Sequence, residues 1–299
     1  MDSWNLPRIF THVIIKTHKV MSTTTQNPQV MTQKPKRGRP AKQQHHVAMI
    51  PSQPIDIKIQ RGSELSFSES LFIPMKIGNE LDTIFSTEGG LMPGVNMVMA
   101  GGAGSGKTTI ALDALASLTE QGYKCLFVSG EMDEIGYYKY CRRMPRIAKV
   151  PVLFLKPYGD KVVETLEQTF DKGWDVVVID SIAEVTMMFK SAYKQTESAA
   201  ETWLLALEDK HKKGHNSTNY YTTFINIQQM TKQGEFVGSN RLKHMADSMC
   251  KVTRTVDGLE RSIHFEKNRD CDKDYKVFFA IRGGSVQYTY QFSSPESED

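Results

Sequence analysis

The stretch VNMVMAGGAGSGKTTIALDALASL, residues Val95–Leu118, passes from an apolar run through six small residues into a helical pattern. Within it, Gly101 is separated by four residues from Gly106, and Lys107 and Thr108 follow directly. This is the spacing G-x-x-x-x-G-K-[ST] of a phosphate-binding loop, which joins a strand to a helix. The stretch therefore predicts a strand, a glycine-rich turn and a helix that begins at about Thr108.

The residue types of this loop suit it to the phosphates of ATP. Glycines let backbone N–H groups turn inward around phosphate oxygens, and the positive end of the helix dipole points at the same anion. We expect Lys107 to reach the β- and γ-phosphates and the Thr108 hydroxyl to hold Mg²⁺. The predicted nucleotide-binding residues are Gly101, Gly102, Ala103, Gly104, Ser105, Gly106, Lys107, Thr108 and Thr109.

Asp180 is the expected second ligand of the metal. It ends the run WDVVVIDS, in which four consecutive apolar residues predict a buried strand. In an α/β sheet such a strand delivers its last residue to the carboxyl edge, where ligands bind. The sequence therefore predicts Mg²⁺ on Thr108 and Asp180.

Two more polar residues follow predicted strands. Glu131 ends the strand in LFVSGEM, and it lies beside the phosphate-binding loop if the two strands are neighbours. A carboxylate there could polarise the attacking water; from the residues alone, an acid that caps the following helix is an equal alternative. Gln229 ends the strand in TTFINIQQMTKQG, where its uncharged amide could register the γ-phosphate and pass the signal to the next loop.

The order of apolar runs predicts the fold class. From about Leu71, short apolar runs alternate with helical segments at 108–121, 133–144, 160–172 and 196–213. Continuous apolar strands need cover on both faces, which predicts an α/β fold with a mainly parallel central sheet. From Cys250 onward, strands separated by turn residues predict an antiparallel extension of that sheet.

Charge and composition divide the chain into three parts. Residues 1–60 lack periodicity and carry nine Lys or Arg against two Asp, so they are predicted to be a disordered basic tail. Residues 61–292 form the predicted ATPase domain, and 293–299 an acidic disordered tail. The tail carries +7 and the remaining residues −4. No apolar run reaches the ~20 residues of a membrane span, and four scattered cysteines predict free thiols in a reducing cytoplasm.

The basic tail contains a short motif of its own. Within KPKRGRPAK, the residues Arg37, Gly38, Arg39 and Pro40 resemble the core of an AT-hook. An extended Arg-Gly-Arg can lie in a narrow A·T minor groove while flanking lysines bind phosphates. This predicts A·T-rich duplex DNA as a partner of the tail, with a generic basic linker or targeting patch as the alternative.

Together these motifs resemble the RecA-like branch of P-loop ATPases, and most closely the ATPase domain of bacterial RadA/Sms. LFVSGEM is similar to the S-G-E-E strand end of that family, VVVIDSIAEV to its D-S metal strand, and QQMTKQGEFVGSNRLKHMADSM to its G-H-V-T-K-E-G run. In EKNRDC, Lys267, Asn268 and Arg269 match K-N-R-F-G, whereas Asp270 and Cys271 do not. The resemblance covers about residues 75–290.

The resemblance implies an ATP-hydrolysing homo-oligomer, a ring or a filament, that acts on single-stranded or branched DNA in recombination and repair. Glu131 would position water, and Gln229 would couple the γ-phosphate to a DNA-contacting loop over 231–243. Lys267 and Arg269 would reach the ATP of a neighbouring subunit, so that the ATP sites are composite. The DNA-contacting residues of the loop would be Lys232, Arg241 and Lys243.

The chain also departs from that family. It shows neither the four-cysteine zinc module nor the Lon-like domain of RadA proteins, so we expect a reduced form of the kind that a bacteriophage encodes, working in the host cytoplasm. Two alternatives stay open: a DnaB-like replicative helicase, which shares the fold and the K-x-R signature, and a KaiC-like nucleotide-gated regulatory protein without a DNA role. The basic loop and the basic tail favour a protein that acts on DNA.

Overall fold

The structure is a computed structural model that describes residues 58–215, 217–230, 240–255, 258, 260–271 and 275–292. For residues 240, 241, 275 and 290–292 it describes the backbone alone. The chain divides into two units, Met1–Ile59 and Gln60–Asp299, and the sheet and helices belong to the second. The predicted terminal tails lie almost wholly outside the described residues.

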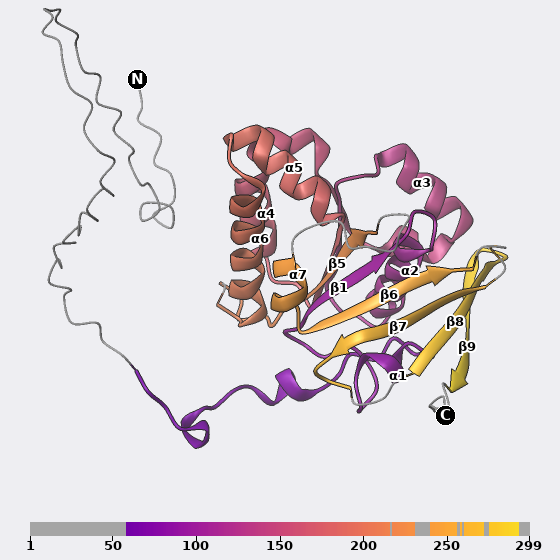
Figure 1. The fold of residues 1–299 in the computed structure, drawn as a ribbon, viewed down its shortest axis with the longest axis horizontal. Coiled ribbons are helices and arrows are strands. Elements are labelled where there is room, and N and C mark those ends of the chain that lie inside the picture. Colours follow the sequence, from indigo (N-terminus) through magenta and orange to yellow (C-terminus); the bar gives the residue numbers. More distant parts are fainter. Residues whose placement is uncertain are drawn as a thin grey trace, which may run out of the picture. The chain divides into compact units, whose positions relative to one another are not determined.

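Within the described residues a nine-stranded sheet has the order β3-β2-β4-β5-β1-β6-β7-β8-β9 (Figure 1). Its parallel strands are β1 (Asn96–Gly101), β2 (Cys125–Ser129), β3 (Val152–Phe154), β4 (Val176–Asp180), β5 (Thr223–Gln229) and β6 (Ser248–Arg254). The antiparallel strands β7 (Arg261–Asn268), β8 (Tyr275–Arg282) and β9 (Ser285–Phe292) extend it on one side. Both parts of the predicted sheet are thus confirmed.

The predicted helices are present, with ends that differ from the expected ones by one or two residues. The α-helices are α1 (Asp82–Phe85), α2 (Lys107–Glu120), α3 (Glu134–Arg143), α4 (Val162–Phe170), α5 (Ile182–Tyr193), α6 (Glu197–Lys212) and α7 (Asn240–Met245). Short 3₁₀ helices are η2 (Gly62–Glu64), η3 (Glu69–Phe72), η4 (Pro145–Lys149) and η5 (Lys156–Lys161). Within the described residues no helix has the length and apolar character that a membrane span requires.

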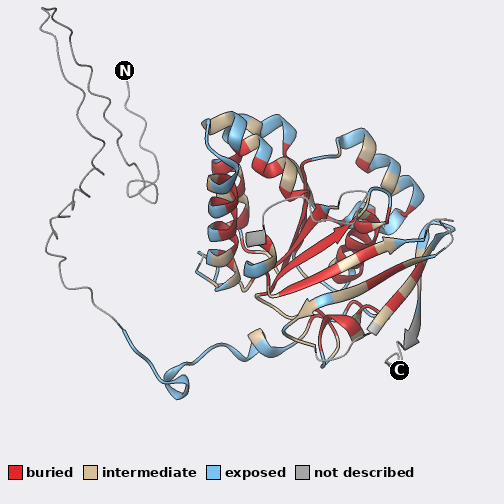
Figure 2. Cartoon of the chain, in the orientation of Figure 1, coloured by how far each residue is buried: buried red, intermediate tan, exposed pale blue. Residues whose placement is uncertain are grey.

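Helices cover both faces of the parallel strands, because alternate strand residues point to opposite sides. Val178 of β4 belongs to the core formed with α2 and α3, whereas its neighbours Val177 and Ile179 belong to the core formed with α4, α5 and α6. Figure 1 shows these two helix groups on either side of the sheet, and Figure 2 shows the buried strands between them. The fold is therefore α/β, as predicted.

The antiparallel extension begins after β6, the last parallel strand. The predicted turn at Gly283–Gly284 joins β8 to β9, and both glycines have positive φ angles of 57° and 79°. Such angles are open to glycine at little cost. Of the other predicted turns, residues 257 and 272–274 lie outside the described residues.

Candidate nucleotide-binding site

The glycine-rich loop runs from Gly101, the last residue of β1, to α2, which begins at Lys107. Gly106 has a φ of 110°, in the left-handed region that side chains disfavour. A Cβ at Gly101 would collide with the carbonyl oxygen of Val252 in the neighbouring strand. The backbone at these two positions therefore requires glycine, and it places the amino end of α2 directly after the loop.

Lys107 folds back onto the loop itself. Its Nζ donates hydrogen bonds to the carbonyl oxygens of Gly101, at 2.8 Å, and Gly102, at 3.0 Å. Burial lowers the pKa of the ammonium, and the nearby carboxylates of Asp180 and Glu131 oppose that shift. A cation in this position can exchange carbonyl oxygens for phosphate oxygens, which are stronger acceptors because they are charged.

Thr108 and Asp180, the two predicted metal ligands, lie in contact. The Thr108 hydroxyl donates to Asp180 Oδ2 across 2.7 Å, although the residues come from α2 and from the end of β4. Burial raises the pKa of Asp180 to about 6; the charge of Glu131 acts in the same direction, while the hydrogen bond from Thr108 and the charge of Lys107 oppose it. A half-buried hydroxyl beside a buried carboxylate supplies oxygen donors of the kind that Mg²⁺ prefers.

The residues present fit a magnesium–ATP complex. Besides the Thr108–Asp180 pair, the loop contains Ser105, whose hydroxyl oxygen is buried and has no hydrogen-bond partner among the described residues. Such an orphaned polar atom is costly unless a ligand or water satisfies it. Phosphates would be held by the loop amides, Lys107 and this hydroxyl, and the metal by Thr108 and Asp180.

Glu131 lies at this site, but not because β2 is the neighbour of β1. The strands β1 and β2 are not neighbours, because β5 and β4 lie between them. Its backbone N–H donates to the Asp180 carbonyl at 3.3 Å, and its carboxylate accepts a hydrogen bond from Gln229 Nε2 at 3.1 Å. The capping role considered for Glu131 belongs to Asp133, whose carboxylate accepts from the Gly136 N–H at 2.7 Å at the start of α3.

Gln229 connects this carboxylate to the phosphate-binding loop. It ends β5, which pairs with β1, and Gln229 lies opposite Gly101 in the register. The next residue, Met230, donates its N–H to the Gly101 carbonyl at 3.0 Å, the same oxygen that accepts from Lys107. The chain that enters the predicted DNA-contacting loop is therefore tied to the oxygen that holds the loop lysine.

Two contacts at this site have no recognisable signal in the sequence. Lys156, in η5 beside the edge strand β3, donates to the Glu131 carbonyl oxygen at 2.6 Å. The Met230 N–H contact comes from backbone geometry, which any residue type could supply. Only the strand order brings these groups together.

The predicted cations Lys267 and Arg269 lie at the opposite end of the sheet, where the parallel strands β1 and β6 begin. Asn268 pairs with Ser248, and Ser248 pairs with Met97 near the start of β1. The phosphate-binding loop follows the other end of β1. Burial lowers the pKa of Lys267, and its Nζ donates to the carbonyl oxygens of Lys243, His244 and Ala246. Arg269 pairs with Asp247 at 3.2 Å. Both cations therefore lie away from the phosphate-binding loop of the same chain.

The predicted DNA-contacting residues are described only in part. Lys232 and the AT-hook-like residues Arg37, Gly38, Arg39 and Pro40 lie outside the described residues, and so does the side chain of Arg241. The backbone of Arg241 and the whole of Lys243 belong to α7. These assignments stay predictions.

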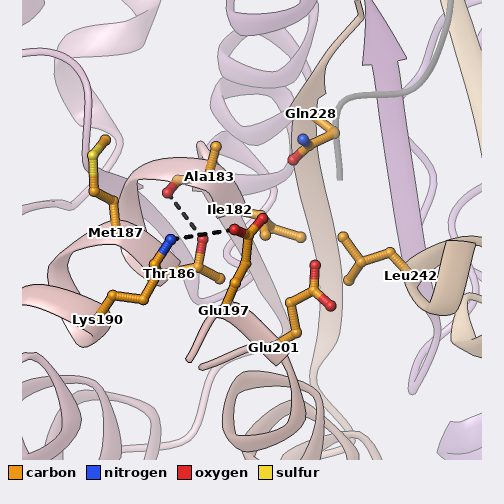
Figure 3. A pocket seen from close by; sticks show the side chains of 9 residues that line it. All are labelled: Ile182, Ala183, Thr186, Met187, Lys190, Glu197, Glu201, Gln228 and Leu242. Atoms are coloured by element: carbon orange, nitrogen blue, oxygen red, sulfur yellow. Dashed lines mark hydrogen bonds and ion pairs between the residues drawn. The ribbon is translucent and has the colours of Figure 1, made fainter. Parts of the chain in front are cut away.

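A cavity of ≈ 190 Å³ is lined by Gln228, the residue before Gln229, and lies between α5, α6, the end of β5 and α7 (Figure 3). Figure 3 shows Lys190 at its rim, paired with Glu197 at 3.2 Å, and Gln228 with Leu242 on the far side. Its lining includes none of the phosphate-binding residues. The cavity is therefore separate from the nucleotide site.

The loop, the Thr108–Asp180 pair and the β3-β2-β4-β5-β1 strand order define a P-loop ATPase domain with a RecA-like fold. Residues 75–146 match the family model of the KaiC ATPase. The resemblance predicted from the motifs is thus confirmed at the level of the ATPase domain.

Among curated proteins, the chain is similar to the DNA repair protein RadA of Campylobacter jejuni, with 31% identity over 194 residues that cover 64% of this chain and 40% of that protein. It is similar to RadA of Pseudomonas aeruginosa with 28% identity over 192 residues, covering 64% and 39%. The chain thus spans about two fifths of the length of these relatives.

Solved structures show the same fold. The KaiC-like protein PH0186 from Pyrococcus horikoshii superposes with a TM-score of 0.53 at 17% identity, covering 73% of this chain and 98% of that one. The RadB recombinase gives 0.50 at 21% identity, covering 71% and 98%. At these identities the likeness establishes the fold alone.

Proposed function

We propose that this chain is an ATP-dependent recombination and repair ATPase of the RecA/RadA type, acting on single-stranded or branched DNA. The observation that carries the proposal is the convergence of two hydrogen-bonded pairs, Thr108–Asp180 and Glu131–Gln229, beside the phosphate-binding loop. One pair suits a metal and the other suits an attacking water. The similarity to proteins named DNA repair protein RadA supports the choice of substrate.

The chemistry proposed for the site is phosphoryl transfer from ATP to water. Bound Mg²⁺ supplies the charge that neutralises the phosphate oxygens. Lys107 and the loop amides bind those oxygens, and Thr108 and Asp180 hold the metal. Glu131 orients the attacking water and accepts its proton. General-base catalysis of this kind raises a reaction rate by roughly 10²–10⁴-fold.

Gln229 is the proposed link between hydrolysis and DNA. Its amide contacts Glu131, and the Met230 N–H donates to the Gly101 carbonyl oxygen, which also accepts a hydrogen bond from Lys107. When phosphate draws Lys107 from Gly101, the contacts of both residues change together. The loop 231–243, with Lys232, Arg241 and Lys243, begins at this point, so nucleotide state and DNA contact are coupled through a few bonds.

The position of Lys267 and Arg269 supports the proposal of a homo-oligomer with composite ATP sites. These cations lie at the end of the sheet where β1 begins, whereas the phosphate-binding loop of the same chain follows the end of β1. A second subunit, in a ring or a filament, would bring its loop to them. Cations supplied in trans to a transferring phosphoryl group are worth ~10³–10⁵ in rate.

The basic tail is proposed to hold A·T-rich duplex DNA near the ATPase domain, through Arg37, Gly38, Arg39 and Pro40. A RadA-type protein that acts on DNA is proposed to work in the cytoplasm, and a bacteriophage is the proposed source. Both statements rest on the proposed substrate and on the resemblance.

A KaiC-like regulatory protein is the second candidate, because residues 75–146 match the KaiC ATPase model. A DnaB-like helicase is a third, and it shares the fold. The experiment that separates them compares the ATPase rate with no DNA, with single-stranded DNA and with duplex, and then tests unwinding of a forked duplex and migration of a branched one. An ATPase rate that DNA does not change, together with no DNA binding at low salt, would select the KaiC-like candidate.

A further inference from the structure

Helix α3, which begins three residues after Glu131, presents one face to solvent. Its exposed residues Ile135, Tyr138, Lys139 and Arg142 recur at intervals of three and four, so they share one side of the helix. Ile135 and Tyr138 are 67% and 63% exposed, so this side of the helix carries apolar surface in contact with solvent. Figure 2 shows α3 as exposed along most of its length.

The other side of α3 is firmly anchored. Tyr137 is buried between Phe127 and Phe154, and its hydroxyl donates to the carbonyl oxygens of Ile147 and Val150 at 3.1 and 3.0 Å. Because Tyr137 already holds the helix to the core, Tyr138 is not needed for packing. The exposed face is therefore a fixed surface on a rigid element.

The segment from α3 to η5 is basic within an acidic domain. Residues 134–161 contain seven Lys or Arg against Glu134 and Asp160, a net charge of +5, whereas residues 61–299 together carry −4. The basic residues are Lys139, Arg142, Arg143, Arg146, Lys149, Lys156 and Lys161. A local concentration of one charge in a domain of the opposite sign favours a polyanionic partner.

Two of these cations remain available on the exposed face of α3. Arg146 and Lys149 pair with Glu120 at 2.7 and 3.2 Å, and so serve the packing of η4 against α2. Within the described residues, no ion pair engages Lys139 or Arg142. The free cations thus lie on the face that also carries the exposed tyrosine ring.

An exposed ring beside exposed cations matches the chemistry of single-stranded nucleic acid. Bases of a single strand can stack on an aromatic ring, whereas those of a duplex are already stacked on each other, and the cations bind the phosphates on either side. Ile135 adds apolar surface one turn before Tyr138. A duplex would use the cations alone and leave the ring and Ile135 in water.

We propose that the exposed face of α3 is a single-stranded DNA contact separate from the loop 231–243. Tyr138 stacks on a base, and Lys139 and Arg142 bind neighbouring phosphates. This inference rests on the proposed function in taking DNA as the polyanion. It adds a second contact point, on the helix that follows the water-orienting carboxylate.

The test measures binding of a labelled oligothymidylate to the full chain by anisotropy across a salt titration. Tyr138→Ala is expected to weaken binding about tenfold, within the range for one stacked base, while Tyr138→Phe retains the ring and the affinity. Lys139→Ala with Arg142→Ala is expected to lower the salt slope by about 1.4, because each phosphate contact to a single strand contributes ~0.7. Lys172→Ala, an exposed lysine just after α4, is the control for charge.

Each outcome bears on the proposal. The inference is overturned if the chain binds the oligonucleotide but the α3 variants keep its affinity and slope; in that case the proposed function stands, provided that Lys232→Ala with Arg241→Ala weakens binding. If the α3 variants instead change the sedimentation of the chain at an unaltered slope, the face is a subunit contact and the inference is wrong. If the chain binds no single-stranded DNA even at low salt, both the proposed function and this inference are overturned. Thermal unfolding shows that each variant folds.

Discussion

Gln229 Nε2 donates to Glu131 Oε1 across 3.1 Å, although their strands β5 and β2 are separated by β4. The residue proposed to register the γ-phosphate therefore touches the one proposed to orient water. One carboxylate oxygen of Glu131 is engaged by this bond, so any movement of Gln229 changes what the carboxylate can accept. In the proposed function, hydrolysis and the following loop are linked at this bond.

Lys107→Ala and Glu131→Gln are expected to fail in different ways. Lys107 contacts phosphate in the ground state, so its loss should weaken ATP binding; Glu131 acts on water, so its amide variant should bind ATP normally and hydrolyse it roughly 10²–10⁴-fold more slowly. Fluorescent-nucleotide titration and kcat measure the two effects. Glu134→Gln, an exposed acid at the start of α3, is the control. Normal turnover by Glu131→Gln would remove Glu131 from the mechanism.

The loop 231–243 is expected to carry the stimulation of ATPase activity by DNA. Lys232→Ala with Arg241→Ala removes two cations that are proposed to bind phosphates, so the ratio of rates with and without single-stranded DNA should approach one. The salt slope of DNA binding should also fall, by about 1.4. Unchanged DNA affinity in this double variant would count decisively against the assignment.

Arg269→Ala is expected to bind ATP normally and to hydrolyse it poorly, because the cation acts in trans. It is a cleaner variant than Lys267→Ala, since Lys267 also holds the carbonyl oxygens at the end of α7 while Arg269 is 62% exposed. Mixing Arg269→Ala with Glu131→Gln should restore ATPase activity. At some hybrid interfaces the Arg269→Ala subunit supplies an intact Glu131, and the Glu131→Gln subunit supplies an intact Arg269. Activity of the wild type should fall steeply on dilution. A mixture that stays inactive although hybrid assembly is demonstrated rules out action in trans.

Deletion of residues 1–60 is expected to lower the affinity for duplex DNA and to remove any preference for A·T tracts. The tail carries +7 and the AT-hook-like residues, so its loss removes both phosphate contacts and minor-groove contacts. Competition between A·T-rich and G·C-rich duplexes measures the preference. If the full chain binds the two equally, the hook interpretation is wrong and a basic tether remains.

Glu208 of α6 is expected to make stability fall as pH rises. It is fully buried, and burial raises its pKa from 4.5 to about 7, against hydrogen bonds from Asn226 and Asn96 and the charge of Lys212. Between those values the folded chain keeps a proton that the unfolded chain has released. Unfolding then releases a proton, and its free energy falls across this window by on the order of 3 kcal/mol.

Urea unfolding at pH 5 and pH 7.5 checks this expectation. In Glu208→Gln the difference between the two pH values should be smaller than in the wild type, while contributions from other groups cancel in the comparison. Glu197→Gln, an exposed acid at the start of α6, should keep the wild-type pH dependence. Equal pH dependence in all three chains would show that Glu208 does not titrate in this window.

Local sequence determined the elements and the residues that end them. A run of four apolar residues before Asp180 is a strand with both faces buried, and the glycines before α2 form a phosphate-binding loop with Lys107, the first residue of that helix. Both features arise because backbone angles and burial depend on neighbours in the chain. The metal pair Thr108–Asp180 could be expected once both elements were recognised. These features depend on short-range chemistry.

Strand order was decided only by the tertiary structure. Strands β1, β2 and β4 are buried on both sides, so their sequences do not state which neighbours they take. The expectation that Glu131 lies beside the loop if β2 neighbours β1 was conditional, and the condition is not met. The bond from Gln229 to Glu131 and the contact of Lys156 with Glu131 depend on that order. The position of Lys267 and Arg269, at the end of the sheet where β1 begins, depends on the antiparallel pairing of β7 with β6. These contacts join residues far apart in the chain, and packing of the two helix layers against the sheet, rather than any local pattern, brings them together.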